Sequence, residues 1–151
     1  MNVTLSVLAD CANITEDGKL NIMGVFGEIN PPELPFALPM MYLVLGFSAS
    51  PSEIGSEKDI IIILMDGEGR RKLVIESKAV VPPPKRSGSP TYIQTILGLA
   101  GCKFEHEGVY DFAIQVNGEE KTRIPLRINT PRREDLDDTA EREHNDDKED
   151  T

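Results

Sequence analysis

A turn between two strand-like segments near the N-terminus constrains the fold of this chain more than any other feature. Asp17-Gly18 lies within residues 8–26, between strands expected near residues 2–12 and 19–27, and polar and apolar side chains alternate on both sides of it. An aspartate that tolerates positive φ, followed by a glycine that adopts it freely, is typical of a tight hairpin turn. The segment therefore predicts an antiparallel pair of strands.

The same pattern recurs along the chain and predicts an all-β fold. Apolar runs of strand length alternate with turn residues, and no window of ten or more residues has a helical period. Residues 66–69 and Asn117-Gly118 predict two more hairpins, whereas the proline-rich segments 30–39 and 82–90 are expected to cross between two sheets. We predict strands near residues 2–12, 19–27, 39–48, 58–66, 70–80, 91–100, 109–117 and 121–129.

These elements predict a single antiparallel β-sandwich of about eight strands, immunoglobulin-like or jelly-roll-like, over residues 1–130. Residues 107–112 resemble the tyrosine corner of immunoglobulin-like folds, in which a tyrosine at a strand start hydrogen-bonds back to the preceding connection. The alternative is that Tyr110 is simply an aromatic residue at the start of a strand. Since the chain has no tryptophan, an antibody-type domain is not expected.

Charge is distributed unevenly along the chain. The net charge is -10, and residues 131–151 hold four basic and ten acidic residues, a net -6, which leaves -4 for residues 1–130. The last segment contains two apolar residues, Leu136 and Ala140, too few to offset its ordering entropy, so we predict a disordered acidic tail. The tail is expected either to solubilise the protein or to dock on a basic partner.

The overall charge and the cysteine content argue against several classes of partner and location. A negative domain is repelled by nucleic acids and by anionic lipid surfaces, and the longest apolar run, residues 60–65, is too short to span a membrane. Two cysteines cannot make a disulfide framework, and no secretion signal opens the chain. We therefore expect a cytoplasmic protein that binds neither nucleic acid nor membrane.

A longer sequence pattern, in three segments of the chain, is similar to that of a known family. It reads ADxANxTxDGKLNIxGVF over residues 9–26, FxxP over 36–39 and GxYxF over 108–112. This pattern, over roughly residues 3–130, resembles a family of small uncharacterised bacterial proteins. The resemblance implies a compact bacterial domain and implies no catalytic or binding residues, since none is assigned in that family.

Residues with reactive side chains form no recognisable catalytic or metal-binding motif. Residues 13–18 have the oxygen spacing that opens a calcium loop, but the closing position is Gly24 instead of a glutamate. Cys11 is expected to be buried on an apolar strand face, Cys102 to be more exposed, and Asp10 to hold a neighbouring loop by hydrogen bonds. We expect no cofactor, no metal and no enzymatic activity.

Two regions are candidates for binding protein. The loop of residues 82–90 is rich in proline and locally basic, and is expected to be either a recognition segment or a stiff crossover. Residues 40–45 and 60–65 are apolar on both faces, whereas a sandwich strand is normally apolar on one. Because the chain offers no spare helix as a third layer, we expect a protein partner or a second copy of the chain to cover such a strand.

The hairpin after residue 65 determines which face is free. A two-residue loop would place Ile60, Ile62 and Leu64 on the core face with Leu73 and Ile75. The opposite face, an apolar centre beside cations, is then the predicted interaction surface, formed by Ile61, Ile63, Met65, Arg70, Lys72 and Val74.

This surface indicates a non-catalytic protein-binding or self-associating module of a bacterial cytoplasm. The alternative is a structural subunit of a phage or phage-derived particle, in which such sandwiches pack by their faces. An enzyme without a recognisable motif is the third interpretation.

Overall fold

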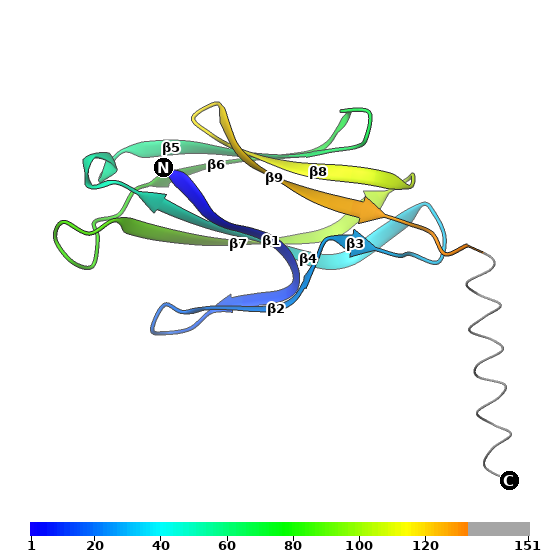
Figure 1. Ribbon diagram of the computed structural model, residues 1–151, viewed down its shortest axis with the longest axis horizontal. Coiled ribbons are helices and arrows are strands. Elements are labelled where there is room, and N and C mark those ends of the chain that lie inside the picture. Colours follow the sequence, from blue (N-terminus) through cyan, green and yellow to red (C-terminus); the bar gives the residue numbers. More distant parts are fainter. Residues whose placement is uncertain (133–151) are drawn as a thin grey trace, which may run out of the picture.

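The strands form two sheets that pack face to face (Figure 1). The computed structural model describes residues 1–132. Sheet A has the strand order β2-β1-β4-β7 and sheet B the order β3-β9-β8-β5-β6. The strands are β1 (Asn2–Ile14), β2 (Leu20–Phe26), β3 (Glu28–Ile29), β4 (Phe36–Ala49), β5 (Glu57–Met65), β6 (Arg71–Val80), β7 (Thr91–Phe104), β8 (Gly108–Val116) and β9 (Glu119–Ile128), with a 3-10 turn η1 (Pro51–Glu53).

The predicted all-β sandwich is confirmed. The three predicted turns lie at the β1–β2, β5–β6 and β8–β9 hairpins. Both proline-rich segments cross between the sheets, since they join β3 to β4 and β6 to β7. The prediction of eight purely antiparallel strands is incomplete, because the two-residue β3 adds a ninth strand that pairs parallel with β9.

The core lies between the sheets and consists of side chains from alternate positions. Sheet A contributes Leu43, Leu45 and Phe47 from β4, and sheet B contributes Phe112 and Ile114 from β8, all fully buried. Burying large apolar side chains on a pleated surface is what makes a sandwich of this length stable without disulfide bonds.

A tyrosine corner joins the two sheets. The Tyr110 hydroxyl donates a hydrogen bond to the backbone carbonyl of His106 at 3.1 Å, and the His106 N–H donates to the hydroxyl at 3.4 Å. The Tyr110 ring is 2% exposed and meets Phe104 edge to face, with 5.1 Å between ring centroids. The bond back to the preceding connection is the one predicted for this residue.

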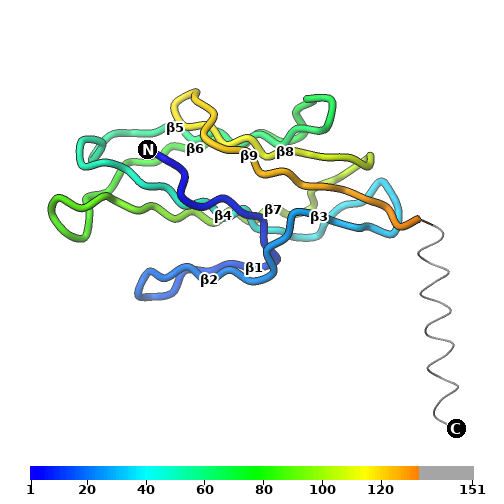
Figure 2. Tube along the Cα trace, viewed as in Figure 1, coloured from blue at the N-terminus to red at the C-terminus, as the bar shows by residue number. Residues whose placement is uncertain are grey.

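A sharp bend in β1 produces a third layer. The first half of β1 pairs with β4, up to Ala9 opposite Tyr42, and the second half pairs only with β2. The hairpin formed by this second half and β2 runs back beneath sheet A (Figures 1 and 2). At its tip, Gly18 lies close to Lys85 of the proline-rich loop, so this layer reaches the start of β7.

Candidate interaction surface

The register of sheet B confirms the predicted faces of β5. Ile60, Ile62 and Leu64 belong to the core, and Leu73 and Ile75 pack against it. The opposite face of β5 carries Ile61, Ile63 and Met65. Sheet B thus turns one side of its most apolar strand away from the core.

Cross-strand pairs arrange this outer face in three rows. The central row is apolar over three strands, and one row lies on each side of it, two residues away along the strands. We call them the central row (Val74, Ile63, Ala113, Arg123), the Arg71 row (Arg71, Met65, Asp111, Pro125) and the Glu76 row (Glu76, Ile61, Gln115, Glu120).

Exposure on this face is greatest at its edge. Val74 is 42% exposed, Ile61 and Met65 are half-buried, and Ile63 is only 4% exposed. Ile63, one of the three residues predicted to form the apolar centre with Ile61 and Met65, is therefore largely covered by its neighbours within the sheet. The accessible apolar surface is provided mainly by Val74, Ile61 and Met65.

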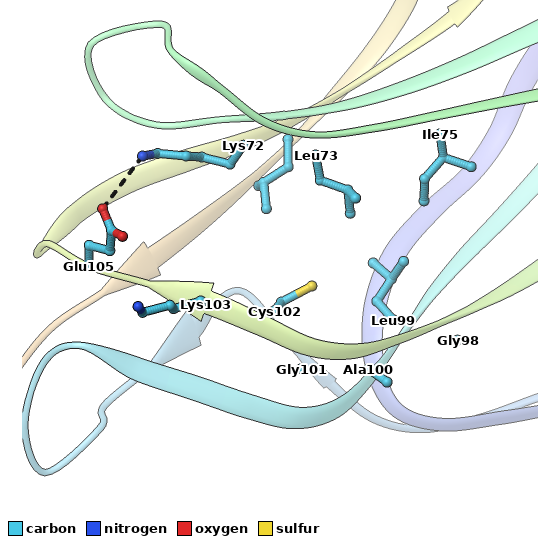
Figure 3. A pocket seen from close by; sticks show the side chains of 11 residues that line it. Lys72, Leu73, Ile75, Gly98, Leu99, Ala100, Gly101, Cys102, Lys103 and Glu105 are labelled. Atoms are coloured by element: carbon cyan, nitrogen blue, oxygen red, sulfur yellow. Dashed lines mark ion pairs between the residues drawn. The ribbon is translucent and has the colours of Figure 1, made fainter.

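Two cations of the predicted surface lie elsewhere. The β5–β6 loop spans residues 66–70 instead of two residues. Next to the loop, Met65 pairs with Arg71 but Leu64 pairs with Leu73, so Lys72 is the extra residue of a β-bulge. Beyond the bulge, from Leu64 back to Ile60, even positions of β5 lie opposite odd positions of β6. The bulge turns Lys72 off the outer face, and its ammonium lies 3.8 Å from Glu105, at the side of the sandwich (Figure 3). The prediction for Lys72 is wrong because a bulge adds one residue to one strand only.

Arg70 belongs to the loop, where it binds Asp66. Its Nε donates to Asp66 Oδ2 at 2.7 Å, and the backbone N–H groups of Glu68 and Arg70 donate to Asp66 Oδ1 at 3.0 and 2.9 Å. Burial by itself would raise the pKa of Asp66, but these hydrogen bonds outweigh it and lower the pKa to about 2. Arg71, not Arg70, stands opposite Met65 in the register.

The other strand that is apolar on both faces, β4, is covered within the chain. Val44 and Ala9 do not belong to the core between the two sheets, yet both are 0% exposed. The hairpin formed by the second half of β1 and β2 lies on this side of sheet A (Figure 1). The expectation that no third layer exists in the chain is thus wrong for sheet A, because a bent strand supplies the layer without a helix.

A groove lies between the tip of this hairpin and the proline-rich loop. It has a volume of about 660 Å³, and Ile14 and Gly18 line one side of it. The other side holds residues 82–86 and Tyr92, which is 69% exposed. The loop therefore crosses between the sheets and also lines a groove with two cations, Lys85 and Arg86, so both sequence interpretations of it stay compatible with its position.

A second hollow, of about 470 Å³, lies at the side of the sandwich between β6 and β7 (Figure 3). Leu73, Ile75 and Leu99 line it, and the Lys72–Glu105 ion pair lies at one end. Cys102 also lines it and is half-buried, and burial raises the pKa of its thiol. A thiol held protonated is a poor nucleophile, so this hollow lacks an activated group.

Three sequence-based placements in β1 and β7 are wrong. Cys11 is exposed and Cys102 is the more buried cysteine, because the bend in β1 carries Cys11 away from the core. Asp10 is exposed and makes no hydrogen bond to any of residues 1–132; its carboxylate lies over Gly24, where an added Cβ would come within 2.3 Å of it.

The residues with calcium-loop spacing contact one another within the β1–β2 turn. The Thr15 hydroxyl donates to the Asp17 carboxylate, and Lys19 forms an ion pair with Asp17 at 2.9 Å. Within residues 1–132, no group of three or more acidic, cysteine or histidine side chains is placed to hold a metal ion.

Polar contacts fix the chain where it leaves sheet B. The Thr130 N–H donates to the Glu107 carboxylate at 2.7 Å, and the Thr130 hydroxyl also donates to it. These bonds lower the pKa of Glu107. The predicted acidic tail, residues 131–151, lies outside the described residues from position 133 onward.

A family model matches residues 4–129, which are nearly all of the sandwich. The chain belongs to this family, a family of unknown function (DUF6941).

Membership of DUF6941 confirms the resemblance to a family without an assigned function. No curated protein and no solved structure matches the chain. No helix among residues 1–132 is long and apolar enough to cross a membrane. The function of this DUF6941 member therefore has to be argued from its surfaces.

Proposed function

We propose that this protein is a non-catalytic interaction module of the bacterial cytoplasm, which binds protein through the outer face of sheet B. The observation that carries the proposal is the difference between the two outer faces. Val44 on sheet A is fully buried, whereas Val74 on sheet B is 42% exposed beside half-buried Ile61 and Met65. An apolar centre with charged residues at its margin is the composition of a protein interface.

Two further features support the proposal. No strand of residues 1–132 lies over the outer face of sheet B (Figure 1). In the hollow between β6 and β7, burial raises the pKa of the Cys102 thiol, so this thiol is not an activated nucleophile. The cytoplasmic setting is supported by the two cysteines, which form no disulfide bond.

Site-specific photo-crosslinking in cells tests this function. A photoreactive amino acid at position 74 should form covalent adducts with protein, and Ile61→Lys should abolish them. The control is the same amino acid at Tyr92, which is 69% exposed and lies at the groove beside sheet A. Absence of adducts from position 74, or equal adducts from both positions, would contradict the proposal.

A further inference from the structure

The outer face of sheet B is self-complementary in charge. In the Arg71 row and the Glu76 row, the strand β6 presents charges of opposite sign, each two ladder positions from Val74. The β-bulge sets Arg71 opposite Met65, so Arg71 is the cation of this pattern. Among residues 1–132, neither Arg71 nor Glu76 has an ion-pair partner.

We propose that the partner of this face is a second copy of the chain, related by a two-fold axis that runs across the strands along the central row. This inference rests on the proposed function and names the partner. The axis places Arg71 of each copy on Glu76 of the other, so that the dimer contains this pair twice. It also places Met65 on Ile61 and brings the exposed Val74 side chains together.

The other two-fold axis in the plane of the face is disfavoured by charge. An axis parallel to the strands would lay β6 of one copy over β9 of the other. Glu76 would then face Glu120 and Arg71 would face Pro125, so neither charge of β6 would gain an opposite partner. The axis across the strands gives both charges an opposite partner and is therefore favoured.

The remaining charge on the central row does not oppose the dimer. Arg123 is the one ionised residue of that row, and its guanidinium already donates to both carboxylate oxygens of Glu120 at 2.6 and 3.1 Å. An ionised group that is paired within its own copy contributes less repulsion across the axis.

The size of the face predicts a weak dimer. Four strands about 4.8 Å apart and about nine residues long at about 3.4 Å per residue cover on the order of 500 Å² per copy. The total, about 1,000 Å², is at the low end for specific interfaces. We expect a dissociation constant in the micromolar range, which requires measurement at high protein concentration.

A charge-reversal experiment on the full chain tests the inference. Sedimentation velocity from about 1 µM to about 1 mM should show a monomer–dimer equilibrium for the wild type. Arg71→Glu and Glu76→Arg should each weaken the dimer at least about tenfold, because each change opposes like charges twice. A mixture of the two variants should form the heterodimer, in which both Arg71–Glu76 contacts regain opposite charges.

Matched controls separate a local effect from a change in net charge. Arg86→Glu and Glu33→Arg reverse exposed charges away from sheet B and should leave the dimer unchanged. Formation of the heterodimer also shows that both interface variants are folded, since unfolded chains could not restore the equilibrium.

Four outcomes would overturn the dimer. They are a monomeric wild type at about 1 mM, variants that dimerise like the wild type, a mixture that does not restore dimerisation, and open-ended assembly instead of a closed dimer. A monomeric wild type together with adducts from position 74 to a different polypeptide would remove the dimer and leave the proposed function standing, whereas loss of both would remove the two together.

Discussion

The tyrosine corner allows a stability prediction whose magnitude follows from the contacts of Tyr110 with His106 and Phe104. Tyr110→Phe removes the hydrogen bond from the hydroxyl to the His106 carbonyl at 3.1 Å and the longer, weaker one that it accepts from the His106 N–H at 3.4 Å, and keeps the ring against Phe104. A hydrogen bond of this kind contributes about 1 kcal/mol net. Since His106 is exposed, water can solvate the freed carbonyl, and we expect a loss of about 1 kcal/mol rather than more.

Tyr110→Ala should cost about 3–5 kcal/mol, because it also removes an aromatic ring that is 2% exposed. Urea unfolding at pH 7, followed by circular dichroism, measures both free energies of unfolding. In a thermal scan, the loss in Tyr110→Phe corresponds to a melting temperature lower by about 4 °C.

Tyr92→Phe is the matched control for the lost hydroxyl. Tyr92 is 69% exposed and its hydroxyl makes no hydrogen bond to any of residues 1–132, so the stability of the Tyr92→Phe variant should equal that of the wild type. If Tyr110→Phe were as stable as the wild type, the hydroxyl would contribute nothing and the corner would be only a packed ring. A loss in Tyr110→Phe close to that in Tyr110→Ala would also refute the separation of bond and ring.

Three further predictions test other parts of the fold by urea unfolding. The lowered pKa of Asp66, about 2 against an ordinary 3.8, stabilises the fold above about pH 4, and this contribution disappears as the pH falls through 2. Asp66→Asn should thus be less stable than the wild type at pH 7 and equal to it below pH 2; a pH-independent difference would contradict this. Gly24→Ala should cost about 1–2 kcal/mol, because Gly24 has a φ of 68° and its Cβ would meet the Asp10 carboxylate. Val44→Asp should cost about 3 kcal/mol or more and Val74→Asp under about 1 kcal/mol; equal losses would show that sheet A has no covering layer.

Local chemistry was sufficient to predict the hairpins and the faces of β5. Gly18, Asn117 and Gly118 have positive φ angles, the backbone property for which those turn residues were selected. A turn depends on a few consecutive residues, and alternation along a strand then assigns each side chain to a face. The sequence also contained the apolar run at residues 60–65, from which the free face of sheet B was correctly inferred to exist.

The tertiary structure decided where that alternation is interrupted and which faces are covered. The bulge between Leu64 and Met65 moved Lys72 toward Glu105 and brought Arg71 to the outer face. The bend in β1 exposed Cys11 and laid a third layer against sheet A. Both features depend on residues far apart in the chain, since a bulge or a bend is stabilised by the packing of a whole sheet and has no short sequence signal. The sequence by itself therefore determined the strands and their turns, and packing between distant strands determined which surfaces remain free to bind.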